Sequence, residues 1–192
     1  KVFEHFCNYC CVNKENGIVD IRLNDMSTGE NAQGIDGIAI IVNHKLVTSV
    51  SEIEFQILNN RSLDVKFVFI QAKTSSSFDN ALMLNFMNFV KVFFSNDISE
   101  FNTSEIMNFF EMKEYIYEHA ECMIEANPQL AMYYVTTGKW VEDRTLKKLV
   151  ERYETELKEL NIFSDIKFVP CGATEIQSLY RNTKNVLSTK FK

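Results

Sequence analysis

The chain has 192 residues, of which 46% are hydrophobic and 24% charged, a balance typical of a folded globular domain rather than of a disordered or fibrous chain. Its formal net charge of −6 argues against an overall electrostatic attraction to nucleic acid. The most apolar helical run, residues 81 to 94, is shorter than the roughly 20 residues of a membrane span and contains Asn85, Asn88 and Lys91, which favours a core helix and no contact with a membrane.

The first residues, Lys1-Val2-Phe3-Glu4, follow a helical pattern and lack an initiator methionine. We therefore expect a piece of a longer protein: a single domain over residues 1 to 192, with the missing C-terminal region of the same chain as a partner. A homo-oligomer is a further partnership that the sequence leaves open.

Five cysteines include three in the run HFCNYCC, which allows two interpretations. With His5 they could form a metal site. Phe3, Cys7, Cys10 and Cys11 also fall on one helical stripe, where free cysteine packs as a small apolar residue, and we favour this interpretation. We expect unpaired, metal-free cysteines and a cytoplasmic location.

The first half of the chain predicts a helix, a hairpin and a further strand. Residues 1 to 14 are helical in pattern, and residues 17 to 33 are ambiguous between a short strand and a loop. The segment GIDGIAIIVN reads as a strand, and Asn43-His44 as a tight turn into KLVTSV. Residues 51 to 65 form a short helix or an excursion before the strand from Lys66 to Lys73.

The second half alternates helices with single strands, and with the hairpin this predicts an α/β fold in which helices flank a mixed central sheet. Ser76 or Ser77 is expected to cap an apolar, buried helix that runs to about Phe94. The further elements are a helix from Ser104 to Ala126 with Ile124 on its core side, a strand in QLAMYYVTT, a helix from Asp143 with Leu160 on its core side, a strand in DIKFVP and a short helix near Glu175 to Arg181.

Three polar residues stand at the ends of two predicted strands. Gln71 and Lys73 share a face of their strand because side chains alternate, and Asp36 opens the earlier strand between Gly34 and Gly37. If the two strands are neighbours, the side chains meet at one edge of the sheet. Alone, Gln71 and Lys73 would also fit a strand that surfaces into solvent.

These residue types suit a divalent metal and a phosphate. Mg²⁺ prefers hard oxygen ligands, so the Asp36 carboxylate, the Gln71 amide oxygen and a backbone carbonyl, that of Ala72, could hold it. Lys73 could orient or deprotonate a water, or stabilise charge on a phosphate. Gly34 and Gly37 would let a polyanionic backbone approach closely.

Four segments together resemble the abortive-infection phage-resistance proteins of bacteria, which carry a nuclease core of the restriction-endonuclease-like PD-(D/E)XK type. They occur in order along most of the chain: GIDGIAIIVN, FVFIQAKTSSSF, NPQLAMYYVTTG and GATEIQSLYR. The resemblance implies a restriction-endonuclease-like mixed central sheet and metal-dependent cleavage of nucleic acid, with DNA as the expected substrate and Mg²⁺ or Mn²⁺ as the cofactor.

By position, the resemblance assigns the metal-binding aspartate to Asp36, the variable acidic position to Gln71 and the catalytic lysine to Lys73, with the carbonyl of Ala72 as a further metal ligand. Glu4 is the candidate acid on the first helix, although an ordinary exposed glutamate is an equal alternative. Gln71 departs from the usual Asp or Glu, so the site loses a negative charge. The competing hypothesis is a nuclease-like module that no longer cuts and binds nucleic acid or protein.

Overall fold

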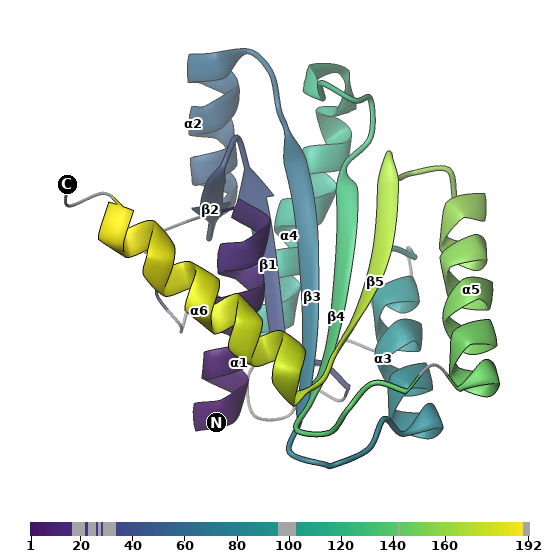
Figure 1. The fold of residues 1–192 in the computed structure, drawn as a ribbon. Helices are drawn as coiled ribbons and strands as arrows, with labels where there is room; N and C mark the ends of the chain where they lie inside the picture. Colours follow the sequence, from purple (N-terminus) through teal and green to yellow (C-terminus); the bar gives the residue numbers. More distant parts are fainter. Residues whose placement is uncertain are drawn as a thin grey trace.

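The computed structural model describes residues 1–16, 34–95, 103–141 and 143–189, together with residues 22, 26 and 28. Within these residues the fold is α/β, as predicted: a five-stranded mixed sheet of order β2-β1-β3-β4-β5 is flanked by helices (Figure 1). The segment from 17 to 33, whose structure the sequence left ambiguous, lies largely outside the described residues.

The predicted hairpin is confirmed. It joins β1 (Gly37–Val42) to β2 (Lys45–Val47), and the two turn residues Asn43 and His44 have φ values of 49° and 63°. A two-residue turn with both residues in the left-handed region matches the twist of the flanking strands. β1 also pairs antiparallel with β3 (Val65–Lys73).

The remaining strands run parallel to β3. These are β4 (Gln129–Thr136) beside β3 and β5 (Asp165–Cys171) at the sheet edge. Parallel strands need a crossover connection, which the intervening helices supply. The carboxyl ends of β3, β4 and β5 therefore lie at one end of the sheet, together with the amino end of β1 (Figure 1).

The sheet divides the core into two apolar layers because alternate side chains of each strand face opposite sides. Phe67 and Phe69 of β3 face one layer, and Val68 and Ile70 face the other. The helices of the first layer are α2 (Val50–Asn60), α3 (Asn80–Phe93), α4 (Ser104–Glu118) and α5 (Arg144–Glu159). The helices of the second are α1 (Val2–Asn16) and α6 (Ala173–Thr189).

The stripe predicted on the first helix is buried. Cys7, Cys10 and Cys11 of α1 have no solvent exposure, and Phe3 packs partly buried against the same layer. All five cysteines are free thiols. Burial raises the pKa of the Cys10 thiol to about 12, so these side chains pack as small apolar groups.

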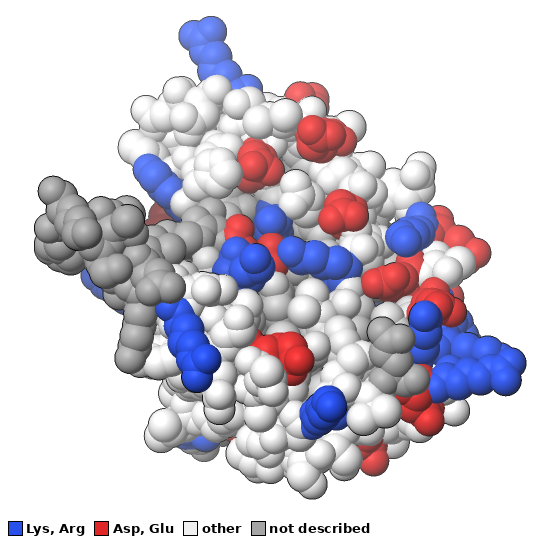
Figure 2. All heavy atoms as spheres, viewed as in Figure 1, with Lys and Arg blue, Asp and Glu red and all other residues white. Residues whose placement is uncertain are grey.

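An ion cluster fixes the carboxyl end of α1 to the sheet. The buried carboxylate of Glu15 accepts hydrogen bonds from Lys66 Nζ at 3.0 Å, from Lys167 Nζ at 2.6 Å and from the hydroxyl of Tyr133. Burial opposes ionisation of Glu15, but these three partners outweigh it and lower its pKa. On the face that carries α1 and α6, acidic and basic side chains are intermingled, without one sign dominating (Figure 2).

Three sequence predictions about the helices were wrong. Asp79, not Ser76 or Ser77, caps α3: its carboxylate accepts from Leu82 N at 2.9 Å. The same helix is amphipathic rather than buried all round, since Leu82 is 39% exposed. The helix from Ser104 ends at Glu118, because a short 3-10 turn and a bridge between Leu63 and Met123 follow it, and Ile124 is 63% exposed.

Two further differences concern the last helices. Leu160 forms the C-cap of α5 and is 40% exposed, so it does not belong to the core side of that helix. α6 is longer than the expected short helix near residues 175 to 181. Within the described residues, no helix combines the length and the apolar character needed to cross a membrane.

Candidate metal and active site

The antiparallel register of β1 and β3 sets Asp36 opposite Gln71. Gly37 pairs with Ile70, and the amide of Asp36 donates to the carbonyl of Ile70 at 2.9 Å. Asp36 therefore extends the ladder by one step at the end where β3 finishes with Gln71 and Lys73. Directly opposite residues of an antiparallel pair are the closest side-chain neighbours in a sheet.

The carboxylate of Asp36 makes two hydrogen bonds at this end of the sheet. Its Oδ2 accepts from the backbone amide of Ala72 at 2.8 Å and from Nε2 of Gln71. The expected convergence of Asp36 and Gln71 is therefore found. Alternate residues of a strand direct their amide and carbonyl groups to the same neighbour, so the Ala72 carbonyl, like that of Ile70, is directed toward the β1 side.

The side-chain amide of Gln71 has one of its two polar atoms hydrogen-bonded and the other unpaired. The residue is 1% exposed, and while its amide nitrogen donates to Asp36, its Oε1 is buried without a hydrogen-bond partner in the described part of the chain. A buried acceptor left without a donor costs about 1–3 kcal/mol, so such atoms are uncommon and call for an explanation.

The surroundings of Asp36 shift its ionisation toward the neutral form. Burial, the largest effect, raises the pKa of its carboxyl group. The Ala72 amide and the positive charge of Lys73 act in the opposite direction, and the negative charge of Glu4 adds to the increase. A cation placed at this carboxylate would reverse the preference, because it would favour the ionised form.

Lys73 and Glu4 lie within electrostatic range of Asp36 without a hydrogen bond to it. Lys73 is partly buried on the same face of β3 as Gln71. Glu4, in the first turn of α1, has a side chain that is 41% exposed and lies 3.4 Å from the amino group of Lys1. Of the predicted site residues, Glu4 is thus the one with the loosest connection to Asp36.

Asn8 is a site residue that the sequence did not reveal. It is 1% exposed, and its Nδ2 donates to the backbone carbonyl of Asp36 at 3.0 Å, while its Oδ1 is buried and has no partner among the described residues. A signal was present: Asn8 lies four residues after Glu4, and residues at that spacing share a helix face.

The space left by the missing side chain of Gly37 is occupied by the side chain of Asn8. A Cβ atom at Gly37 would lie 2.5 Å from both amide atoms of Asn8, so the missing side chain lets α1 approach the start of β1. The expectation that Gly37 leaves room for a phosphate backbone is therefore wrong. Gly34 has a φ of 81°, which explains a glycine at that turn.

Tyr134 adds a third unpaired group. It is the β4 partner of Gln71 in the parallel register, has no solvent exposure, and its hydroxyl has no hydrogen-bond partner in the described ranges. Burial, with smaller effects from the charges of Asp79 and Asp36, raises its pKa to about 12. The hydroxyl thus stays protonated near neutral pH and remains a possible donor.

Taken together, oxygen atoms dominate this end of the sheet. Where the structure describes the chain, no group of three or more His, Cys, Asp or Glu residues is placed to hold a metal ion. A metal at Asp36 would therefore rely on amide and carbonyl oxygens beside the carboxylate.

Compared with known proteins, the chain matches no family model, no curated protein and no solved structure.

Proposed function

We propose that this chain is a metal-dependent nuclease domain of the restriction-endonuclease-like type, which hydrolyses phosphodiester bonds of nucleic acid in bacterial defence against phage. One observation carries the proposal: Asp36 and Gln71 are in contact at the paired ends of two antiparallel strands, with Lys73 two residues further on the same face. The mixed sheet, in which this antiparallel pair is followed by the parallel strand β4, supports the fold assignment.

The oxygen atoms around Asp36 fit Mg²⁺ or Mn²⁺. Such hard cations take carboxylate, amide and carbonyl oxygens and keep several waters. The Asp36 carboxylate, Gln71 Oε1 and the Ala72 carbonyl are the proposed ligands. Gln71 Oε1 is buried and has no donor among the described residues, so a cation would satisfy a group that is otherwise costly to bury.

In this proposal, Gln71 has two orientations. In the structure its amide nitrogen donates to Asp36 Oδ2, so a positively polarised group occupies the place beside the carboxylate. Turning the amide would present Oε1 to a metal at the same carboxylate. The exchange needs only a side-chain rotation, because amide oxygen and nitrogen are nearly equal in size.

Lys73 is proposed to act on the reacting phosphate. Its ammonium is held near Asp36 on the last residue of β3, where it would orient the attacking water and stabilise the negative charge that develops on phosphate oxygens. The metal, when bound, would lower the pKa of its water and so generate the nucleophile. Glu4 would add negative charge near Asp36 that Gln71 lacks.

The test is a cleavage assay with end-labelled DNA and RNA in Mg²⁺ or Mn²⁺. We expect cleavage by the wild type, none with a chelator, and a rate at least about 10²-fold lower in Lys73→Ala, the usual cost of removing a group that stabilises transition-state charge. Lys45→Ala is the matched control, because Lys45 is exposed on β2 and pairs with the far end of β1.

Two outcomes would contradict the proposal. Cleavage that is equal in wild type and Lys73→Ala would show a contaminating nuclease. Binding of nucleic acid without cleavage, unaffected by Lys73→Ala, would instead support the module that no longer cuts. The reason for considering this alternative is that Gln71 stands where a carboxylate is usual.

A further inference from the structure

A hollow lies in the same row of the sheet as the candidate site. Pro170 of β5 pairs with Tyr134 of β4, which pairs with Gln71 of β3. Neighbouring strands are about 4.8 Å apart, so this row places Pro170 about 10 Å from Gln71. The hollow has a volume of about 170 Å³ and is lined by Trp140, Lys147, Val150, Glu151, Phe168 and Pro170.

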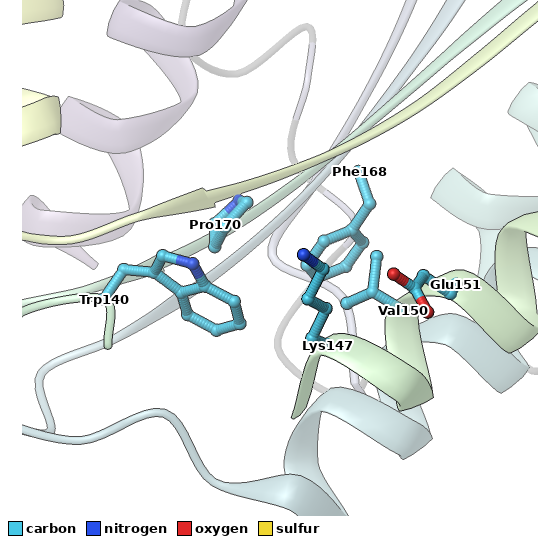
Figure 3. A pocket seen from close by; sticks show the side chains of 6 residues that line it. All are labelled: Trp140, Lys147, Val150, Glu151, Phe168 and Pro170. Atoms are coloured by element: carbon cyan, nitrogen blue, oxygen red, sulfur yellow. The ribbon is translucent and has the colours of Figure 1, made fainter. Parts of the chain in front are cut away.

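The hollow combines apolar walls with one ammonium group, that of Lys147, and one carboxylate, that of Glu151. Trp140 and Pro170 stand on one side of it and Phe168 and Val150 on the other, while the ammonium of Lys147 lies between them (Figure 3). Trp140 is partly buried and meets the ring of Phe78 edge to face, with a centroid distance of 4.8 Å. The indole is thus held in place and still partly accessible.

The loop that carries Trp140 is fixed to the segment after Lys73. Thr137 donates through its amide to the carbonyl of Ser75 at 3.1 Å and through its hydroxyl to that of Thr74 at 3.1 Å. A Cβ at Gly138 would lie 2.1 Å from the carbonyl oxygen of Ser76, so only glycine allows this approach. These contacts join the loop that carries Trp140 to the residues that directly follow Lys73.

We infer that this hollow is a nucleobase subsite, which takes a guanine of a single-stranded nucleic acid next to the bond that is cleaved. Bases of unpaired strands stack on aromatic side chains, and this is worth a comparable amount for every base. The preference comes from Lys147, whose ammonium has only hydrogen-bond donors. Guanine offers two adjacent acceptors, O6 and N7, whereas adenine replaces O6 by a donor.

The surroundings of the hollow suit the phosphates on either side of such a base. The loop before α5 and the first nine residues of α5 carry five basic residues, with Asp143 and Glu151 in the same stretch. The basic residues are Lys139, Arg144, Lys147, Lys148 and Arg152. That the ligand is a nucleic acid rests on the proposed function; the shape and donor pattern of the hollow do not.

The chain contains a single tryptophan, so its fluorescence reports on this hollow alone. The test titrates the protein, with a chelator present, with short oligothymidylates that carry one central guanine or one central adenine. We expect saturable quenching, with guanine bound about tenfold more tightly, and weaker binding of the same sequence as a duplex because its bases are already stacked. The mononucleotide dGMP should bind more weakly than the strand.

Variants separate the subsite from general charge. Lys147→Met should remove the guanine preference, and Trp140→Ala, followed by the anisotropy of a labelled strand, should weaken binding of both strands about tenfold. Lys148→Met is the matched control: it removes the same charge one residue further along α5, where Lys148 lines a different hollow beside α3, and it should keep the preference.

Equal quenching by the guanine strand and the adenine strand, unchanged in Lys147→Met, would overturn the inference. Binding of dGMP as tight as that of the guanine strand would overturn the assignment of the ligand as a nucleic-acid strand. Because these titrations contain no free metal, they are independent of cleavage. Metal-dependent cleavage without guanine-selective quenching would leave the proposed function standing and remove the subsite. Guanine-selective quenching without metal-dependent cleavage would contradict the proposed function and leave the base-binding hollow standing.

Discussion

Replacing Gln71 by glutamate turns the buried contact with Asp36 into a pair of carboxylates. The amide nitrogen that donates to Asp36 Oδ2 is lost, and a second negative charge takes its place on a residue that is 1% exposed. Two unit charges 4 Å apart repel each other by about 4 kcal/mol at an effective dielectric constant of about 20. We therefore expect Gln71→Glu to be strongly destabilised when no divalent metal is present.

Protonation limits this loss and gives it a pH dependence. Both carboxylates would have folded-state pKa values above their unfolded values, so the destabilisation is absent below the unfolded pKa and grows as the pH rises. Binding one proton instead costs about 1.4 kcal/mol per pH unit above an unfolded pKa of about 4.3, which is about 4.5 kcal/mol at about pH 7.5 and about 1 kcal/mol at about pH 5. The expected loss is therefore the full repulsion of about 4 kcal/mol at about pH 7.5, and only about 1 kcal/mol at about pH 5. Native domains have only about 5–15 kcal/mol of stability, so the effect is large.

The assay is urea unfolding followed by circular dichroism, at both pH values, with a chelator or with Mg²⁺. Saturating Mg²⁺, at about 100 times its dissociation constant, should restore about 2.7 kcal/mol. Gln56→Glu is the matched control, because Gln56 is 5% exposed on α2, in contact with Asn60 and away from Asp36, and its loss of stability should not respond to Mg²⁺. A Gln71→Glu variant as stable as wild type in chelator, or one that Mg²⁺ does not rescue, would refute the reasoning.

Three further predictions follow from buried polar groups. As the pH is lowered, the Mg²⁺ affinity of the wild type should begin to fall at a higher pH than for an ordinary carboxylate, because burial raises the pKa of Asp36 and the metal competes with its proton. Calorimetric titrations at several pH values check this, and a pH-independent affinity would contradict it. Glu15→Gln should lower the free energy of unfolding by about 2–3 kcal/mol, since Lys66 and Lys167 lose their anion but remain partly exposed; urea unfolding measures this, and an unchanged midpoint would show that the cluster adds nothing. Tyr134→Phe should raise the thermal midpoint or leave it unchanged, because the removed hydroxyl has no hydrogen-bond partner among the described residues; a marked fall would reveal a partner such as a buried water.

The contact between Asp36 and Gln71 was predictable from the sequence because it depends on local rules. Alternation along a strand puts Gln71 and Lys73 on one face, and the short hairpin at Asn43-His44 reverses the chain. Once β1 lies beside β3, the lengths of the two strands place Asp36 opposite Gln71.

The rest of the site depends on tertiary packing that periodicity does not encode. Asn8 reaches Asp36 only because α1 lies against Gly37, which fixes the rotation of that helix. Lys113 illustrates the same limit: in a helix rich in acids it is 2% exposed, donates to the carbonyl of Phe93 at 3.1 Å and lies 3.7 Å from the centre of the Phe110 ring. Its partners come from another helix or from one turn away, and the charge pattern of its own helix does not reveal them.

Binding of Mn²⁺ to the wild type and to Asp36→Asn tests the central claim most directly. The substitution removes the charge and keeps the shape and an oxygen that can accept from the Ala72 amide, so the fold should persist. Titration of the chain with Mn²⁺, followed by the paramagnetic resonance signal of the free ion, should show one site in the wild type and none in the variant. Equal binding by both proteins would contradict a metal centre at Asp36 and Gln71, and with it the proposed metal-dependent nuclease.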